Sequence, residues 1–109
     1  MSESLRYVVL RHEGVEEGHF DLMFETKRGS DLATWRVREW PIDERSEFVQ
    51  LRAHRRVYLT YEGTISGDRG SVHRVHSGHH VVEEDRAERL VVRLENGEQL
   101  VLPKGGRGR

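Results

Sequence analysis

Apolar and polar residues alternate with a period of two along most of the chain, which is typical of strands that bury one face. The pattern is strictest in residues 19–26, HFDLMFET, where Phe, Leu and Phe occupy successive even-numbered positions. The odd-numbered positions carry His, Asp, Met and Glu, and they face the opposite side of the predicted strand. This alternation favours a sheet protein over a helical one.

Glycines and charged clusters divide the alternating pattern into short segments. We predict strands at Leu5–His12, His19–Thr26, Leu32–Val37, Ser71–His76, Leu90–Glu95 and Glu98–Pro103, and two strands with a break within Phe48–Tyr61. Loops are predicted at Glu13–Gly18, Lys27–Asp31, Glu39–Arg45 and Glu62–Gly70. A turn is predicted at Gly78, a short helix or wide loop at Glu83–Arg89, and a hairpin turn at Asn96–Gly97, where both residues tolerate positive φ.

Many short strands at near-regular spacing, with at most one or two short helices, indicate a mainly β protein. We expect a small closed or partly open antiparallel β-barrel, and a sandwich is the alternative. With 109 residues, the chain is long enough for one core, so we predict a single domain over residues 1–103. Residues 104–109, KGGRGR, are expected to form a disordered basic tail, and a tail that contacts nucleic acid is the less favoured interpretation.

Composition excludes several classes of protein. The chain has no Cys, so any metal ligands are nitrogen or oxygen atoms. Its 18 basic and 19 acidic residues nearly cancel, which argues against coating nucleic acid through bulk charge. No apolar run approaches the roughly 20 residues of a membrane helix, and no signal peptide is evident, so we expect a cytoplasmic monomer without a membrane partner. The 16 Arg against 2 Lys fit either a GC-rich genome or bidentate recognition of phosphate.

Two histidines and an aspartate form the first candidate site. If the strands on either side of Glu13–Gly18 pair as a hairpin, His12 and His19 lie opposite each other, with Cβ atoms roughly 5 Å apart. Asp21 lies on the same face, roughly 6.8 Å further along the strand. Two imidazoles and a carboxylate suit Mn²⁺, Zn²⁺ or Fe²⁺. The ordinary alternative is that these side chains only line a solvated strand face.

His54 and Tyr58 form the second candidate site. A histidine can transfer a proton near neutral pH, and a tyrosine hydroxyl can donate to a phosphate oxygen. The alternative is a partly buried tyrosine beside a surface histidine. The remaining histidines, which are His73, His76, His79 and His80, are predicted to lie on the surface.

These sites belong to a series of motifs that occur in the same order in a known family. The sequence resembles the 3′-phosphoesterase domain of bacterial DNA ligase D, an enzyme of non-homologous end joining. The matching segments are Arg11-His12 and, after a spacer, His19-Phe20-Asp21-Leu22-Met23-Phe24-Glu25; then Ala33-Thr34-Trp35-Arg36-Val37; then His54, Tyr58 and Tyr61-Glu62-Gly63; and finally Gly70-Ser71-Val72 with Gly78. Together they cover about residues 6–95.

The resemblance implies a compact β-barrel that removes a 3′-phosphate or a 3′-ribonucleoside from a primer end with the help of a divalent metal, Mn²⁺ by preference and Zn²⁺ as the alternative. It assigns His12, His19 and Asp21 as metal ligands, and His54 and Tyr58 as catalytic residues that contact and protonate the scissile phosphate. The implied partners are nucleic-acid 3′ ends and the ligase or polymerase proteins of end joining.

The sequence departs from the family pattern at Met23. The ligase-borne domains carry an arginine at this position, two residues after the metal-binding aspartate, and methionine cannot clamp a phosphate. The chain resembles a short free-standing relative, in which two alternatives to catalysis remain open. One is a non-catalytic module that binds a metal or phosphate in the same pocket, and the other is a purely structural barrel.

Overall fold

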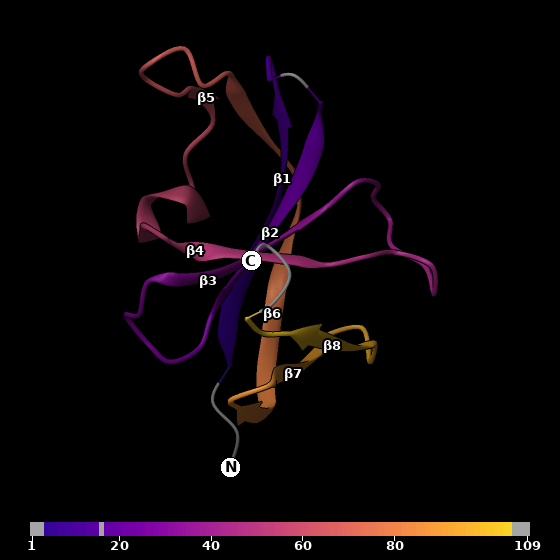
Figure 1. Ribbon diagram of the computed structural model, residues 1–109. Coiled ribbons are helices and arrows are strands. Elements are labelled where there is room, and N and C mark those ends of the chain that lie inside the picture. The colour runs from indigo at the N-terminus through magenta and orange to yellow at the C-terminus, as the bar shows by residue number, and fades with distance from the viewer. Residues whose placement is uncertain (1–3, 16, 106–109) are drawn as a thin grey trace.

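The computed structural model describes residues 4–15 and 17–105, which form one antiparallel sheet of eight strands and one 3-10 helix (Figure 1). The elements are β1 (Leu5–Glu13), β2 (His19–Glu25), β3 (Leu32–Val37), β4 (Val49–His54), η1 (Arg56–Leu59), β5 (Gly63–Thr64), β6 (Ser71–Arg86), β7 (Arg89–Leu94) and β8 (Gln99–Pro103). The described residues contain no helix that could span a membrane.

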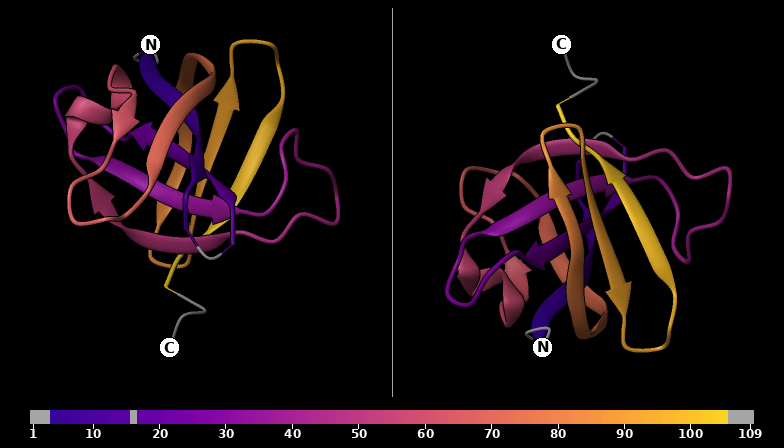
Figure 2. Two further views of the ribbon diagram at one scale, coloured as in Figure 1. Left: turned by 90° about the horizontal axis from the view of Figure 1, so that it is seen from above. Right: turned by 90° about the horizontal axis from the view of Figure 1, so that it is seen from below.

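The sheet curls because one long strand takes part in both of its halves. The strand order is β4-β3-β2-β1-β6-β7-β8, with β5 paired to β6 at the side. The first part of β6 pairs with β1 and its last part pairs with β7, so the β7–β8 hairpin turns over the rest of the sheet (Figure 2). The fold is therefore mainly β, a partly open antiparallel barrel, and this prediction is confirmed.

Contacts between the two ends of the sheet hold the curl together. The Trp35 indole N–H on β3 donates to the carbonyl oxygen of Pro103 at the end of β8, at 2.6 Å. The Gly105 backbone N–H donates to the side-chain oxygen of Gln50 on β4, also at 2.6 Å. Lys104, at the start of the predicted tail, forms an ion pair with Asp85. Residues 106–109 of that tail lie outside the described part of the chain.

Alternation along the strands produces two apolar clusters, one on each side of the sheet. The inner core lies between the two halves of the curled sheet and includes Tyr7, Val9, Leu22, Phe24, Trp35, Val37 and the apolar residues of β7 and β8. The outer core consists of Val8, Leu10, Met23, Leu32, Leu59 and Val72, and Tyr58, Tyr61 and Ile65 pack against it. Helix η1 and the segment after it therefore cover the outer face of the sheet.

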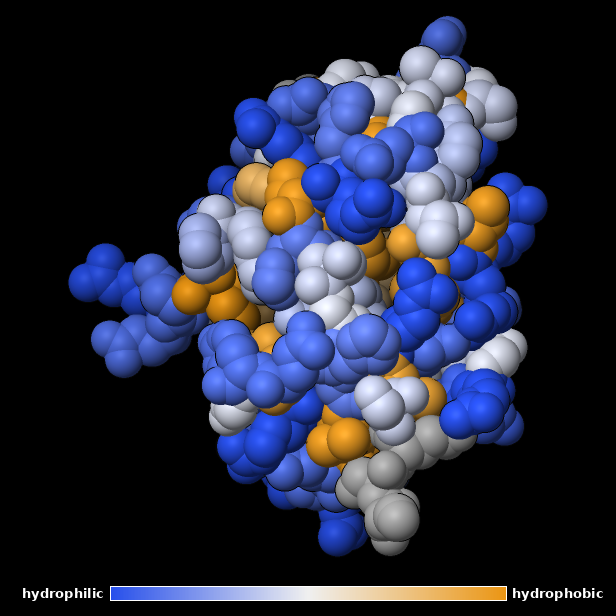
Figure 3. Space-filling view, turned by 180° about the vertical axis from the view of Figure 1, so that it is seen from behind, coloured by the Kyte–Doolittle hydropathy of each residue, from blue (hydrophilic) through white to orange (hydrophobic). Residues whose placement is uncertain are grey.

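The surface away from these cores is mainly hydrophilic. On the face shown in Figure 3, apolar groups form small separate patches between charged and polar residues. The large apolar side chains that are exposed in the described residues are Val57, Val75 and Val101, which lie on different elements. This arrangement is expected when about a third of a chain is charged.

The second of the two strands predicted within Phe48–Tyr61 is wrong, because Arg56–Leu59 form η1. Its turn is closed by backbone hydrogen bonds from Tyr58 N–H to Arg55 and from Thr60 N–H to Val57, both 3.1 Å long. Arg56 fixes the helix to the sheet by donating to Glu25 at 2.6 Å and to the Ser30 carbonyl at 2.9 Å. Burial of Glu25 by itself raises its pKa, but bonds from the Arg6 N–H and Arg56 outweigh this effect and lower it. Tertiary contacts thus override the local strand propensity.

The predicted turn at Gly78 and the predicted helix or loop at residues 83–89 are also wrong, because β6 runs without interruption to Arg86. Gly78 faces Tyr7 on β1, and a Cβ atom there would lie 3.1 Å from the Tyr7 ring. The glycine makes room for a neighbouring ring and does not form a turn. Further along, Glu83 pairs with Arg93 at 2.7 Å, so the polar sequence of β6 is stabilised across the strand pair.

Close approach of two backbones requires the glycine at position 70. Gly70 has φ of +83°, and a Cβ atom there would lie only 2.0 Å from the carbonyl oxygen of Glu13 at the end of β1. Gly29 has the same φ of +83°, but its position has no heavy atom within 4 Å of an added Cβ. The two glycines therefore share a backbone conformation, but only Gly70 lacks the space for a side chain.

We expect Gly70→Ala to destabilise the protein much more than Gly29→Ala, as measured by urea unfolding. Backbone strain alone costs about 1–2 kcal/mol at either site. At residue 70, the displaced Glu13 backbone adds roughly 1–3 kcal/mol. Equal losses in the two variants would contradict the close approach of β1 to the loop before β6.

Candidate metal centre

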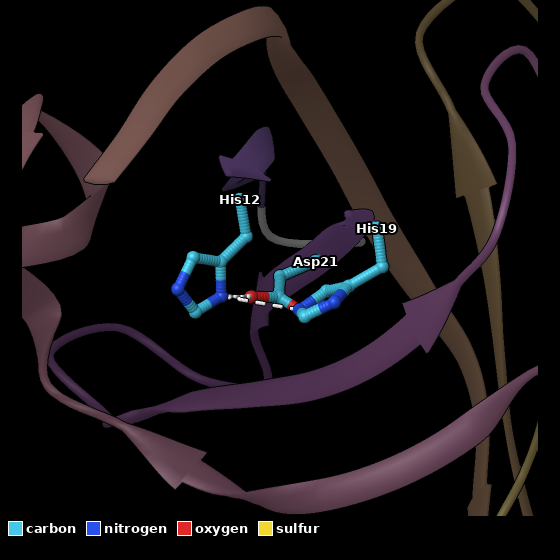
Figure 4. A group of neighbouring side chains, drawn as sticks. All are labelled: His12, His19 and Asp21. Carbon is cyan, nitrogen blue, oxygen red and sulfur yellow. Dashed lines mark hydrogen bonds and ion pairs between the residues drawn. The ribbon is translucent and has the colours of Figure 1, made fainter. Parts of the chain in front are cut away.

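The β1–β2 hairpin brings His12, His19 and Asp21 together on the outer face of the sheet. His12 lies directly opposite His19, as the sequence predicts, and Leu10 lies opposite Asp21. The three side chains point toward one another (Figure 4), and one ligand atom from each lies within 4.8 Å of the others. His19 and Asp21 are buried and His12 is partly buried, so this cluster is shielded from bulk water.

Backbone carbonyls determine which nitrogen of each histidine carries a proton. Nε2 of His12 lies 2.7 Å from the carbonyl oxygen of Arg69, and Nδ1 of His19 lies 3.1 Å from that of Glu17. A carbonyl oxygen only accepts, so these two nitrogens are the donors. In the neutral rings, Nδ1 of His12 and Nε2 of His19 are then unprotonated, and they face each other at 3.1 Å.

The electrostatic environment favours neutral His19. Burial lowers the pKa of this histidine, and the opposing attraction of the Asp21 carboxylate does not reverse the effect. A neutral imidazole with its second nitrogen bonded to a carbonyl is the form in which histidine binds metal ions.

The cluster fits a divalent cation. Ligand bonds of about 2.0–2.2 Å separate neighbouring ligand atoms by about 2.8–3.6 Å. In the cluster, the two facing nitrogens are 3.1 Å apart, and Asp21 oxygens lie 3.6 Å from His12 Nδ1 and 3.5 Å from His19 Nε2. In the described part of the chain, Oδ1 of Asp21 is buried without a hydrogen-bond partner, which is unfavourable in the absence of a cation. Two nitrogens and an oxygen suit Mn²⁺ or Zn²⁺.

The cluster borders an open hollow of about 750 Å³ beside the β1–β2 turn. His12 and His19 line one side of it, so a molecule in the hollow can reach the cluster. The other charged residues that line it are Glu17, Arg36, Arg38, Glu39, Arg45 and Glu47. The hollow therefore carries both signs of charge next to the candidate metal ligands.

His54 and Tyr58 lie toward the opposite end of the same strands. Their rings contact each other with centroids 5.8 Å apart, and His54 Nδ1 lies 3.0 Å from the Arg52 carbonyl oxygen. His54 is aligned across β3 and β2 with Glu25, four residues beyond Asp21, which corresponds to roughly 13 Å along the strand. Among the described residues, no hydrogen bond, ion pair or ring contact connects His54 or Tyr58 to the three-residue cluster.

Sequence reasoning missed Arg36, which lies directly opposite Asp21 on β3. A charged residue within the predicted strand Leu32–Val37 was a sign that it has a partner across the sheet. Which residue that partner is depends on the β2–β3 register. The prediction that His80 lies on the surface is wrong. His80 is buried, its Nε2 lies 2.8 Å from the Glu25 carbonyl oxygen, and burial lowers its pKa.

No family model matches the chain, and no curated protein matches it.

Proposed function

We propose that this protein is a divalent-metal-dependent phosphoesterase that acts on 3′-phosphate or 3′-ribonucleoside ends of nucleic acid. The observation that carries the proposal is the convergence of His12 Nδ1, His19 Nε2 and the Asp21 carboxylate at 3.1–3.6 Å. The resemblance of the ordered motifs to the 3′-phosphoesterase domain of DNA ligase D supports it. End healing in the cytoplasm, before ligase or polymerase proteins act, is the role that this resemblance implies.

Each side chain has a defined task in this proposal. His12, His19 and Asp21 hold Mn²⁺ or Zn²⁺, and the Arg69 and Glu17 carbonyls keep both rings in the binding orientation. When bound, such an ion polarises a phosphoryl oxygen and lowers the pKa of a water molecule. The resemblance assigns proton transfer to His54 and a phosphate contact to Tyr58, and His54 is aligned roughly 13 Å along the strand from Asp21. Because the net charge is −1, contact with nucleic acid is confined to the terminus.

Primers that end in a 3′-phosphate or a 3′-ribonucleotide, incubated with Mn²⁺, test the activity. We expect the wild-type protein to release product only with the metal, and His19→Ala to give none. His54→Gln tests the role that the resemblance assigns to this residue: a loss of about 100-fold indicates a general acid. An unchanged rate indicates that His54, which is aligned roughly 13 Å along the strand from Asp21, takes no part in the reaction. The matched control is His73→Ala, an exposed histidine on β6. Equal product from wild type and His19→Ala, or none from either, would refute the activity.

The second candidate is a non-catalytic module that binds a metal or phosphate in the same site. It is favoured by Met23, which is 1% exposed within the outer core, where a phosphate-clamping arginine is absent. Calorimetry with Mn²⁺ and Zn²⁺ separates the two candidates. Metal binding without turnover of either primer supports the binding module.

A further inference from the structure

We propose that Arg36 binds the phosphate group at the metal centre, in a subsite formed by the hollow beside β3. This inference rests on the proposed metal site and adds to it the residue that recognises the anion. Four observations carry it, which are the register of Arg36, its unused donor, its access to the hollow and the packing of Met23.

The sheet register places Arg36 next to the metal ligands. Arg36 and Asp21 are directly opposite each other on β3 and β2, so their side chains emerge on the same face. The Arg36 Nε atom lies 3.9 Å from Asp21 Oδ1, close enough for electrostatic attraction and too far for a hydrogen bond. A group bound to an ion at Asp21 is therefore within reach of this guanidinium.

The Arg36 guanidinium has a donor without an acceptor. Its Nε is buried and has no hydrogen-bond partner in the part of the chain that the structure describes, and the same holds for Oδ1 of Asp21. A cation at the cluster would engage the carboxylate, and an anion would engage the guanidinium. A metal–phosphate pair would therefore meet the two opposite charges that the β2–β3 register places side by side.

The side chain of Arg36 also opens into the hollow. It is 43% exposed, while its Nε is shielded from solvent, so the accessible surface lies on its other atoms. Arg36 lines the hollow together with His12 and His19. A planar guanidinium at this place can donate two parallel hydrogen bonds to phosphate oxygens.

On the side of the cluster that faces Met23, apolar packing leaves no room for an anion. Met23, the next residue along β2 on the same face, is packed in the outer core with Val8, Leu10 and Leu59. An anion there would have to displace apolar side chains. The open hollow on the Arg36 side is therefore the place where a phosphate can approach the metal ligands.

Arg38 supplies a matched control on the same strand end. It lines the same hollow, but its side chain is 79% exposed and it pairs with Glu17 at 3.5 Å. Arg36→Gln and Arg38→Gln each remove one positive charge from the hollow. Their comparison separates a specific contact from a general effect of charge.

The test measures Mn²⁺ binding by calorimetry and then inorganic phosphate binding to the Mn²⁺-loaded protein by paramagnetic broadening of the phosphorus resonance. We expect Arg36→Gln to keep its Mn²⁺ affinity and to weaken phosphate binding by about 10- to 100-fold. Arg38→Gln should match the wild type, and Arg36→Lys should recover part of the loss through its charge.

The outcomes distinguish this inference from the proposed function. If the wild type binds Mn²⁺ but no phosphate, or if Arg36→Gln binds phosphate as tightly as the wild type, the assignment of Arg36 is wrong and the metal site stands. Equal losses in Arg36→Gln and Arg38→Gln also overturn it, because they indicate an effect of charge alone. A wild type that fails to bind Mn²⁺ overturns both proposals.

Discussion

Asp21→Asn is expected to abolish tight Mn²⁺ binding without destabilising the metal-free protein. In the wild type, the carboxylate lies beside one ring nitrogen of each histidine, and its Oδ1 has no hydrogen-bond partner in the described residues. An asparagine amide can donate to these nitrogens, so the loss of the charge is compensated within the fold. The metal loses an anionic ligand, which should reduce affinity by more than the ~10–100-fold caused by losing an outer hydrogen-bond partner.

Thermal unfolding with and without Mn²⁺ measures both effects. At a concentration of 100 times Kd, the metal should stabilise the wild type by about 2.7 kcal/mol, which corresponds to roughly 10–20 °C in Tm for a domain of this size. Asp21→Asn should show no such shift, and its Tm without metal should equal or exceed that of the wild type. The control, Asp31→Asn, changes an exposed aspartate in the β2–β3 turn and should keep the full shift.

The opposite pattern would contradict a metal site. If Asp21→Asn lowers the Tm of the metal-free protein and Mn²⁺ leaves the wild-type Tm unchanged, Asp21 is a structural residue that is bonded to the two histidines. One experiment therefore distinguishes a binding site from a buried polar network.

Trp35→Ala is expected to cause the largest loss of stability among single substitutions in the inner core, about 3–5 kcal/mol. The Trp35 side chain is fully buried and lies edge-to-face against Phe24, with ring centroids 6.1 Å apart. Its indole N–H donates to the Pro103 carbonyl, so the substitution also removes a bond between the two ends of the curled sheet. Urea unfolding, with the slope checked for two-state behaviour, measures the change.

The other tryptophan provides the comparison. Trp40 is half-buried at the margin of the inner core, and Trp40→Ala should cost less than half as much. Trp35→Phe keeps a ring and removes only the N–H donor, so it should cost much less than Trp35→Ala and isolate the bond to Pro103. If Trp35→Ala and Trp40→Ala are equally destabilising, the ends of the sheet are not held together as described.

The strands near the candidate site were predictable because their signals are local. The alternation in residues 19–25 determines which side chains share a face, and the short spacer after His12 favours antiparallel pairing with that strand. The opposition of His12 and His19 follows directly from these two facts and is present in the structure. The Asn96–Gly97 hairpin was predictable for the same reason, because its turn chemistry lies in two adjacent residues.

The errors occurred where distant contacts decide the conformation. Residues 57–59 have a strand-like composition but form a helical turn, because Arg56 bonds to Glu25 and Leu59 packs on the outer core. The local sequence around Gly78 predicts a turn, but Gly78 lies within β6, next to the ring of Tyr7 on β1. Neither partner is a neighbour in the sequence, and no local pattern reveals it.

By itself, the sequence determined the mainly β class, most strand positions, and a nitrogen-and-oxygen donor set on one face of the first hairpin. The period-two alternation and the turn residues are local signals that act over a few residues. The absence of cysteine is a property of the whole chain, and it limits the ligand atoms to nitrogen and oxygen. Only the tertiary structure decided that β6 carries the curl, that the Arg69 and Glu17 carbonyls orient the two histidines, and that Arg36 lies beside Asp21. Those features depend on strand register and loop approach between distant segments, which the alternating pattern leaves undetermined.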